Sequence, residues 1–163
     1  MTVYVSADAL YSISREIQTA RSIETGGILL GKDLKNGDML ITHAIGPGPN
    51  SIKKQCVFRK DFDYSVKMLN VLYSRYSVDF IGDWHKHPTC CVNYSATDFS
   101  SMIKITNTNK KQCFFIIVGD DYDQINNNLA LYTVEINSTV VNKIPFVIVQ
   151  SPETVACNIG FKD

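Results

Sequence analysis

The segment Ile81–Asp98 constrains the fold of this chain more than any other stretch. It reads IGDWHKHPTCCVNYSATD. Residues 78–85 have the apolar content of a buried strand, and Pro88 ends that strand because proline cannot donate to a sheet ladder. Ser95 and Asp98 then have the spacing of a capping box, which predicts a helix over residues 96–106. The chain must therefore contain a strand that leads through a short polar loop into a helix.

Apolar spacing predicts more strands and two more helices around this unit. Helical periodicity covers residues 7–22, where Ser6 can act as the N-cap, and a second helix follows the candidate N-cap Asp61. The dipeptide Asn36-Gly37 predicts a tight hairpin. Strands are predicted at residues 3–5, 28–30, 39–45, 56–58, 113–118, 129–136 and 144–149, with a loop at 46–50 and a turn at 126–128. We therefore expect an α/β or α+β fold in which three helices pack on a mixed sheet.

The length and charge of the chain limit its class. A chain of 163 residues suits a single domain, which we expect to span residues 1–163. The 16 basic and 16 acidic side chains cancel, so no overall field attracts nucleic acid or an anionic membrane. The basic side chains at positions 53, 54, 59 and 60 form the only candidate cluster, which we interpret as a solvated surface. We expect neither a nucleic-acid partner nor a membrane partner.

Cysteine usage and the N-terminus favour a cytoplasmic protein. Residues 1–5 lack the basic and apolar regions of a signal peptide, and no apolar run approaches the ~20 residues that span a bilayer. The five cysteines include no C-x-x-C pair, so a structural zinc knuckle is not expected. Their odd number and irregular spacing favour reduced thiols.

The loop and helix after residue 84 carry the residues of a metal site. Side chains alternate along a strand, so His85 and His87 face one side while Trp84 and Lys86 face the other. Asp98 begins the next helix and can fold back toward them. Two imidazoles and one carboxylate form a catalytic zinc site that leaves a position for water, whose pKa falls to about 7 there.

A base is also needed to move protons during metal-assisted hydrolysis. Glu24 is the candidate, because it precedes the glycine pair Gly26-Gly27 at the entry to a buried strand. The alternative is a polar residue at the end of a helix, followed by a turn. Asp83 is a rival ligand on the same face as His85, although its position favours a supporting or surface role.

The same residues also allow plainer interpretations. Ser95 and Asp98 alone are an ordinary capping box, and a histidine on a strand is usually a core or surface residue. A cysteine hydrolase would pair Cys90 or Cys91 with a histidine, but the sequence offers no group to orient that base. Zinc deaminases require an H-x-E motif with a later P-C-x-x-C, and neither is present. We expect His43, the third histidine, to be structural.

Taken together, Glu24, His85-x-His87-Pro88 and Ser95-x-x-Asp98 resemble the JAMM motif of the JAB/MPN+ metalloproteases, most closely the prokaryotic JAB branch. The resemblance implies the MPN/JAB fold, which is similar to that of cytidine deaminases. It implies one catalytic Zn²⁺ held by His85, His87 and Asp98, with Glu24 as general base and acid. Ser95 would bind the oxyanion.

The resemblance also implies a substrate class. Members of the family cleave isopeptide or peptide bonds after the C-terminus of ubiquitin or ubiquitin-like proteins, and prokaryotic relatives accompany E1- and E2-like enzymes in antiviral operons. Some members are inactive scaffolds, but those lack parts of the motif. This chain departs from many relatives between Pro88 and Ser95, where prolines are common. The candidate substrate-binding residues in that segment are Thr89, Cys90, Cys91, Val92, Asn93 and Tyr94.

Overall fold

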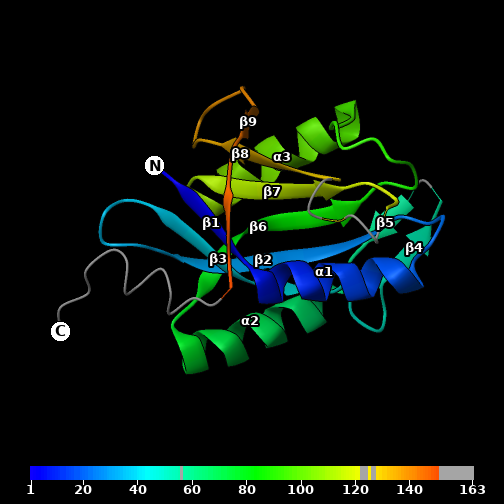
Figure 1. Cartoon of the computed structure of the whole chain (residues 1–163), viewed down its shortest axis with the longest axis horizontal. Helices are drawn as coiled ribbons and strands as arrows, with labels where there is room; N and C mark the ends of the chain where they lie inside the picture. The colour runs from blue at the N-terminus through cyan, green and yellow to red at the C-terminus, as the bar shows by residue number, and fades with distance from the viewer. Residues whose placement is uncertain (56, 122–124, 126–127, 151–163) are drawn as a thin grey trace.

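The computed structural model describes residues 1–55, 57–121, 125 and 128–150, which form one large sheet, a small hairpin and three helices (Figure 1). The expected mixed sheet with three helices is confirmed. In chain order the elements are β1 (Val3–Ser6), α1 (Ala7–Thr19), β2 (Thr25–Asp33), β3 (Met39–Ile45), β4 (Ile52–Lys54), β5 (Val57–Arg59), α2 (Phe62–Tyr76), β6 (Asp79–Lys86), α3 (Ala96–Asn109), β7 (Cys113–Val118), β8 (Leu129–Val134), β9 (Asn142–Ile144) and β10 (Val147–Val149).

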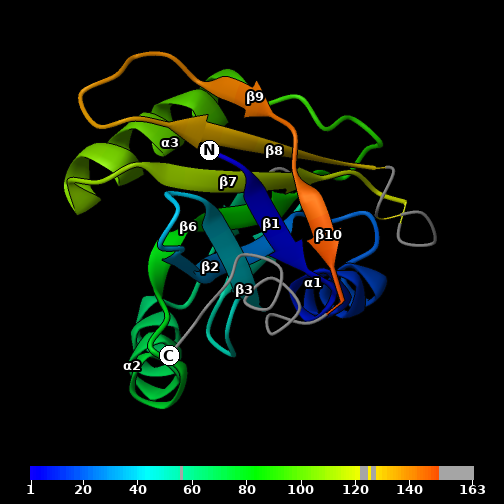
Figure 2. The same cartoon turned by 60° about the vertical axis from the view of Figure 1, so that its left-hand side comes forward.

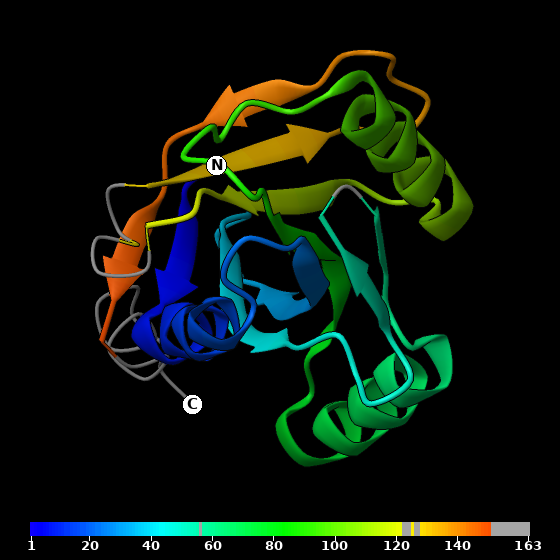
Figure 3. The ribbon, with the colours of Figure 1, turned by 90° about the vertical axis from the view of Figure 1, so that its right-hand side faces the viewer.

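The large sheet has the strand order β10-β1-β3-β2-β6-β7-β8-β9. Strand β1 is parallel to β3 and β10, and β6 is parallel to β7, whereas the other neighbours are antiparallel. Strands β9 and β10 lie at opposite edges although only residues 145–146 separate them. The sheet must therefore curl until its two edges approach each other, as Figures 2 and 3 show.

Several predicted boundaries differ from the structure for local physical reasons. The single strand predicted at 144–149 is wrong, because Pro145 interrupts the ladder and splits the segment into β9 and β10. The strand predicted at 56–58 is β5, and its partner β4 was not predicted. Helix α1 ends at Thr19, three residues before the predicted end. Cys56, Asn126 and Asn127 lie outside the described residues.

The three helix starts follow the predicted caps. Ser6 accepts a hydrogen bond from the backbone N of Ala9, and Asp61 accepts one from the backbone N of Tyr64. Ser95 and Asp98 form both reciprocal bonds of the capping box. Within the described residues, no helix has the length and apolar character needed to cross a bilayer.

The core has an inner and an outer layer because successive residues of the central strands face opposite sides. Helix α1 packs on the inner face of the curled sheet, and helices α2 and α3 pack on its outer face. The inner layer includes Leu10, Ile13, Ile17, Leu29, Ile41, Trp84, Ile116 and Leu131. The outer layer includes Met68 and Leu69 against Ile28 and Leu30, and Met102 against Phe115, Ile117 and Tyr132. The polar ends of β2 and β6 lie beside each other where this core ends.

Gly27 is required where β2, β3 and β6 meet. The indole Nε1 of Trp84 donates to the carbonyl oxygen of Ile45 at 3.0 Å. A Cβ at position 27 would collide with that same carbonyl group. Only glycine lets the three strands approach so closely.

We expect Gly27→Ala to lower the free energy of unfolding by about 1–3 kcal/mol, because the backbone of β3 must shift to accept the methyl group. Urea denaturation measures this change. Gly46→Ala is the matched control, because a Cβ there meets only the Glu16 carboxylate, at 3.7 Å. Equal stability of the two variants would contradict this account of the strand junction.

Candidate metal centre and active site

His85, His87 and Asp98 converge on one point at the end of β6. The Nε2 atoms of His85 and His87 lie 3.0 Å apart. Asp98, in the first turn of α3, places Oδ1 3.2 Å from Nε2 of His85 and Oδ2 3.3 Å from Nε2 of His87. Each residue offers one ligand atom to the same small volume. We refer to these three residues as the three-ligand group.

The spacing of the three-ligand group fits a tetrahedral ion. Ligand atoms that lie 2.0–2.1 Å from a tetrahedral zinc are about 3.3 Å from one another. The two Nε2 atoms lie 3.0 Å apart, and each has one Asp98 carboxylate oxygen at a similar distance, Oδ1 at 3.2 Å from His85 and Oδ2 at 3.3 Å from His87. Two imidazole nitrogens and a carboxylate oxygen also form a donor set that zinc prefers. The residues present therefore fit a metal ion.

A backbone carbonyl orients one of these histidines. Nδ1 of His87 lies 2.9 Å from the carbonyl oxygen of Cys91. A proton on Nδ1 donates to that oxygen, which leaves Nε2 directed toward the centre of the group. The sequence carries no signal for this contact, because a main-chain carbonyl is available at every residue.

The charges of the group are strongly coupled. Burial opposes ionisation of Asp98, but hydrogen bonds from His85 and His87 outweigh it and hold the pKa of the carboxyl below its usual range. The hydrogen bond to Asp98 raises the pKa of His87, against the effect of burial. Without an ion, the carboxylate thus favours a proton on the imidazole. A metal ion must displace that proton, so metal binding is coupled to pH.

This coupling predicts how the stability of the metal-free protein depends on pH. A raised His87 pKa stabilises the fold below the unfolded value of about 6.5, and that contribution disappears as pH rises through the folded value. The lowered pKa of Asp98 stabilises the fold above the unfolded carboxyl value of about 4, and this contribution is lost as the pH falls below that value. We expect the urea midpoint of the metal-free protein to fall between about pH 6 and pH 8. His87→Gln should flatten that slope, and an unchanged slope would refute the coupling.

Glu24 lies beside this group because of the β2–β6 register. Gly26 pairs with His85 and Thr25 pairs with Lys86, so continuing the ladder by one residue places Glu24 next to His87, on the same face. A Cβ at Gly26 would collide with the backbone of β6, which explains the glycine. The alternative of a polar residue at a helix end is not supported, since α1 ends at Thr19.

The carboxylate of Glu24 is available for chemistry. Within the described part of the chain, no hydrogen bond or ion pair engages it. Burial raises its pKa, an effect that the positive charges of His85 and His87 partly offset. A carboxylate with a raised pKa accepts a proton more readily than an exposed one, as a general base requires.

Ser95 caps helix α3 and also keeps a hydroxyl hydrogen for a further hydrogen bond. Its Oγ accepts a hydrogen bond from the backbone N of Asp98 at 3.1 Å, and its own N donates to Asp98 Oδ2 at 2.7 Å. The capping box therefore fixes the third member of the group, as the sequence suggested. The hydroxyl hydrogen of Ser95 is not used by the cap and can donate to another acceptor.

Asp83 does not join the three-ligand group. Its Oδ2 accepts a hydrogen bond from Nζ of Lys60. Burial raises the pKa of this carboxyl, an effect that Lys60 opposes. Its Oδ1 is buried without a partner among the described residues. Asp83 is thus paired with Lys60, and its second carboxylate oxygen has no hydrogen-bond partner among the described residues.

The predicted substrate segment, Thr89–Tyr94, lies along the edge of the site. All its residues are exposed except Val92, which is partly buried. The hydroxyl of Tyr132 donates to the carbonyl oxygen of Val92 at 2.9 Å. The Tyr94 ring packs edge-on against the Tyr132 ring, with 5.3 Å between the ring centroids. Sequence reasoning missed Tyr132, because it lies in a strand far along the chain.

The cysteine hydrolase alternative gains no support. Cys90 and Cys91 are free and exposed. His87 contacts the backbone carbonyl of Cys91 rather than its thiol, and no described contact joins either thiol to an imidazole. The third described cysteine, Cys113, is also free, but it is buried in the outer core layer.

The basic cluster and His43 are largely accounted for within the fold. Lys53 pairs with Glu16 at 3.1 Å, and Lys60 pairs with Asp83. Two of the four side chains in the candidate basic cluster are therefore paired with carboxylates. His43 contacts the hydroxyl of Thr42 at 2.8 Å and stacks on a tyrosine of α2, away from the other two histidines.

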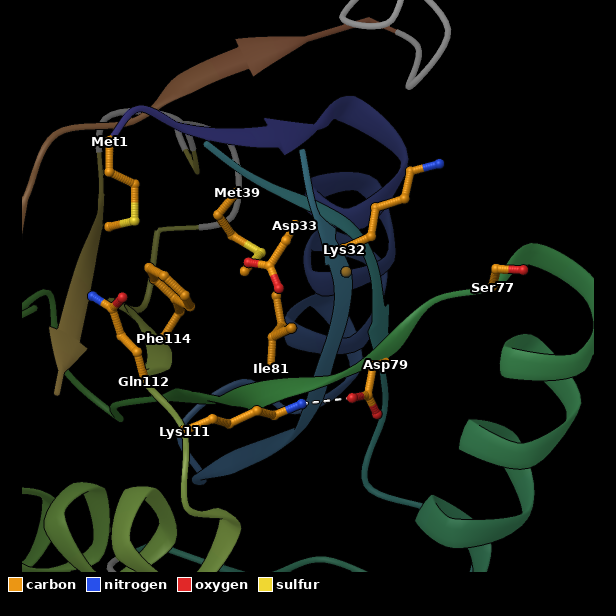
Figure 4. A pocket seen from close by; sticks show the side chains of 11 residues that line it. Met1, Lys32, Asp33, Met39, Ser77, Asp79, Ile81, Lys111, Gln112 and Phe114 are labelled. Atoms are coloured by element: carbon orange, nitrogen blue, oxygen red, sulfur yellow. Dashed lines mark hydrogen bonds and ion pairs between the residues drawn. The ribbon is translucent and has the colours of Figure 1, made fainter. Parts of the chain in front are cut away.

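A separate hollow of about 500 Å³ lies at the other end of the same strands (Figure 4). Its lining includes Asp33, Asp79 and Lys111, and the ion pair between Asp79 and Lys111 measures 2.6 Å. Asp79 and His85 are six residue steps apart along β6, which corresponds to about 20 Å of strand. None of the predicted site residues contributes to this hollow.

Known proteins provide an independent comparison. A curated relative from Enterobacter hormaechei subsp. hoffmannii (strain UCI 50), named CD-NTase/cGAS isopeptidase, is 28% identical over 127 residues, which is 74% of this chain and 68% of the relative. The solution structure of protein DSY2949 from Desulfitobacterium hafniense superposes with a TM-score of 0.68 at 13% identity, and covers 94% of this chain and 97% of that one. AF2198, a JAB1/MPN domain protein from Archaeoglobus fulgidus, has a TM-score of 0.55 at 18% identity, with 92% and 100% covered.

The likeness to AF2198, which is named as a JAB1/MPN domain protein, confirms the MPN/JAB fold that the motif implied. A family model described as prokaryotic homologs of the JAB domain matches residues 6–132. This range includes β2, β6 and the start of α3, and therefore every residue of the predicted motif. The chain belongs to the prokaryotic JAB-domain family.

Proposed function

We propose that this protein is a JAMM-type zinc isopeptidase that hydrolyses the bond after the C-terminus of a ubiquitin-like modifier, or of another conjugated protein. The observation that carries the proposal is the convergence of His85, His87 and Asp98, beside a Glu24 carboxylate that has no partner among the described residues. An inactive scaffold has no need for such a carboxylate. In this proposal residues 1–163 act as one catalytic domain in the cytoplasm.

Three residues would hold the ion and one would move protons. His85, His87 and Asp98 would bind a single Zn²⁺. When bound, this ion would act as a Lewis acid that makes water nucleophilic at neutral pH. Glu24 would take a proton from the attacking water and deliver it to the leaving amine nitrogen. One water molecule is consumed, one C–N bond breaks, and a carboxylate and an amine are released.

Ser95 would stabilise the charge that develops on the substrate carbonyl. Its hydroxyl hydrogen is free of the capping box, so it can donate to the oxyanion without loss of the helix cap. The exposed segment Thr89–Tyr94 would contact the extended C-terminal tail of the substrate. This role is supported by its place at the edge of the site, next to His87.

The name of one relative supports a substrate class for this proposal. The relative from Enterobacter is named CD-NTase/cGAS isopeptidase, so a conjugate of a cGAS-like enzyme is the first substrate to test. E1- and E2-like enzymes encoded nearby would supply such a conjugate, in a role in antiphage defence. No nucleic-acid or membrane partner is proposed.

A fusion assay tests the proposal. The protein would be incubated with Zn²⁺ and with ubiquitin-like or cGAS-like proteins that carry short extensions, joined through an α-amine or a lysine side chain. We expect cleavage directly after the natural C-terminal residue, with loss of activity after exhaustive chelation and its return with added Zn²⁺. Absence of cleavage in a zinc-loaded protein would indicate the scaffold alternative. Cleavage that survives chelation would exclude the metal mechanism.

A further inference from the structure

Lys86 lies between the two histidines in the sequence, but its side chain is on the opposite face of β6 and has no exposed surface. A lysine so deeply buried is rare unless it is paired. Its Nζ contacts Asp120 Oδ1 at 2.9 Å, the carbonyl oxygen of Arg21, and the carbonyl oxygen of Ile23 at 3.3 Å. These three acceptors match the three hydrogens of an ammonium group.

The partners of Lys86 belong to two segments that border the site. Arg21 and Ile23 form the turn between α1 and β2, and this turn leads directly into Glu24. Asp120 follows β7, and its backbone N donates to the carbonyl oxygen of Thr89 at 2.9 Å. One buried cation therefore connects the turn that precedes Glu24 with the first residue of the predicted substrate segment.

Glu24 depends on its backbone for its position. Its carboxylate has no hydrogen-bond partner in the described part of the chain, so contacts of the main chain must direct it. Its backbone N donates to the carbonyl oxygen of Lys54 at 3.1 Å. The carbonyl of Ile23, on the other side of the same peptide group, accepts from Lys86. These two contacts fix the peptide plane from which the Glu24 side chain extends.

We propose that Lys86 is a positioning residue, which holds the turn at residues 21–23 so that the Glu24 carboxylate faces the three-ligand group. This role rests on the proposed function, in which Glu24 transfers protons. A misplaced base loses rate, because proton transfer depends on close geometry. Metal binding involves other residues, and Thr89 is held by the backbone N of Asp120 rather than by its side chain, so both substrate binding and metal binding should persist when Lys86 is replaced.

Kinetics of Lys86→Met test the role, because methionine keeps the size of the side chain but removes the cation. We expect kcat to fall about 10- to 100-fold, with KM and Zn²⁺ affinity within about twofold of the unsubstituted protein. In a Glu24→Gln background the same substitution should cause no further loss. Lys111→Met is the control: it removes the ion pair to Asp79 at the other end of the same strand (Figure 4), and it should leave kcat unchanged.

Hydrogen–deuterium exchange gives a readout that does not require turnover. We expect the amides of Ile23 and Glu24 to exchange faster in Lys86→Met but not in Lys111→Met. Asp120→Asn covers the case in which Lys86→Met does not fold. It removes only the counter-charge, at a partly exposed position, and should lower kcat several-fold with faster exchange of the same two amides.

The outcomes separate this inference from the proposed function. If the unsubstituted protein cleaves no conjugate, the proposed function fails. The effect of Lys86 on the turn can still be tested in that case, because unchanged amide exchange at Ile23 and Glu24 in Lys86→Met would refute it. If cleavage occurs, unchanged kcat in folded Lys86→Met or Asp120→Asn would overturn the inference. Additive loss in the Glu24→Gln background would overturn it as well, because the lysine would then act independently of Glu24.

Discussion

Replacement of Glu24 by glutamine is expected to lower kcat by about 10²- to 10⁴-fold, the usual contribution of general acid–base catalysis. Glutamine keeps the size of the side chain but cannot accept a proton. Because Glu24 is not a member of the three-ligand group, the variant should bind one Zn²⁺ as tightly as the unsubstituted protein. The measurements are the steady-state cleavage of a fusion substrate and the zinc content after dialysis.

The matched control for this substitution is Glu135→Gln. Glu135 is exposed and follows β8, so its replacement should change neither cleavage nor zinc content. Unchanged turnover in Glu24→Gln would refute the assignment of the base. Loss of zinc from the same variant would indicate instead that Glu24 helps to hold the ion.

The second large effect, a loss of both zinc affinity and cleavage, is expected from His85→Ala. This change removes one of the ligand atoms and leaves Asp98 Oδ1 without its partner at 3.2 Å. Zinc affinity should fall by at least about 100-fold, since even substitution of residues that support a ligand costs 10- to 100-fold. Cleavage should become undetectable at zinc concentrations that saturate the unsubstituted protein. Competition with a chromophoric chelator measures the affinity directly.

The third histidine provides the control for this experiment. His43 lies on β3 and stacks against Tyr76 of α2, with a ring-centroid distance of 5.4 Å. His43→Gln should keep both the zinc affinity and the cleavage rate. Equal losses of zinc in His85→Ala and His43→Gln would show that general destabilisation, rather than removal of a ligand, caused the effect.

Local patterns were sufficient to predict much of the fold. The capping box at Ser95 and Asp98, the cap at Asp61 and the hairpin at Asn36-Gly37 use interactions within a few residues, and the structure contains each of them. Strand β7 is a continuous apolar run and matched its predicted bounds. Such signals depend on chemistry that neighbouring residues share.

Long-range pairing was harder to predict from the sequence. Strand β4 contains two lysines in three residues, so it has no apolar alternation. It is held by β5 and by the backbone contact of Lys54 with Glu24. Likewise, the sequence around Pro145 does not indicate that β9 and β10 pair with opposite edges. That arrangement depends on the curl of the whole sheet.

The site shows the same division between near and distant contacts. His85 and His87 could be placed on one face from strand alternation alone, whereas their contact with Asp98 needed the loop to fold back. The supporting contacts of Cys91 and Tyr132 were not predictable, because one uses a backbone carbonyl and the other crosses 40 residues. Lys86 was predicted only to face away from the histidines.

Titration of the metal-free protein with Zn²⁺, while cleavage of a fusion substrate is followed, tests the central claim most directly. We predict no turnover before zinc is added, a linear rise, and a plateau at one ion per chain. The His85→Ala variant should show no rise over the same range. Full turnover in the presence of excess chelator, or a rise in His85→Ala equal to that of the unsubstituted protein, would contradict a catalytic ion held by His85, His87 and Asp98.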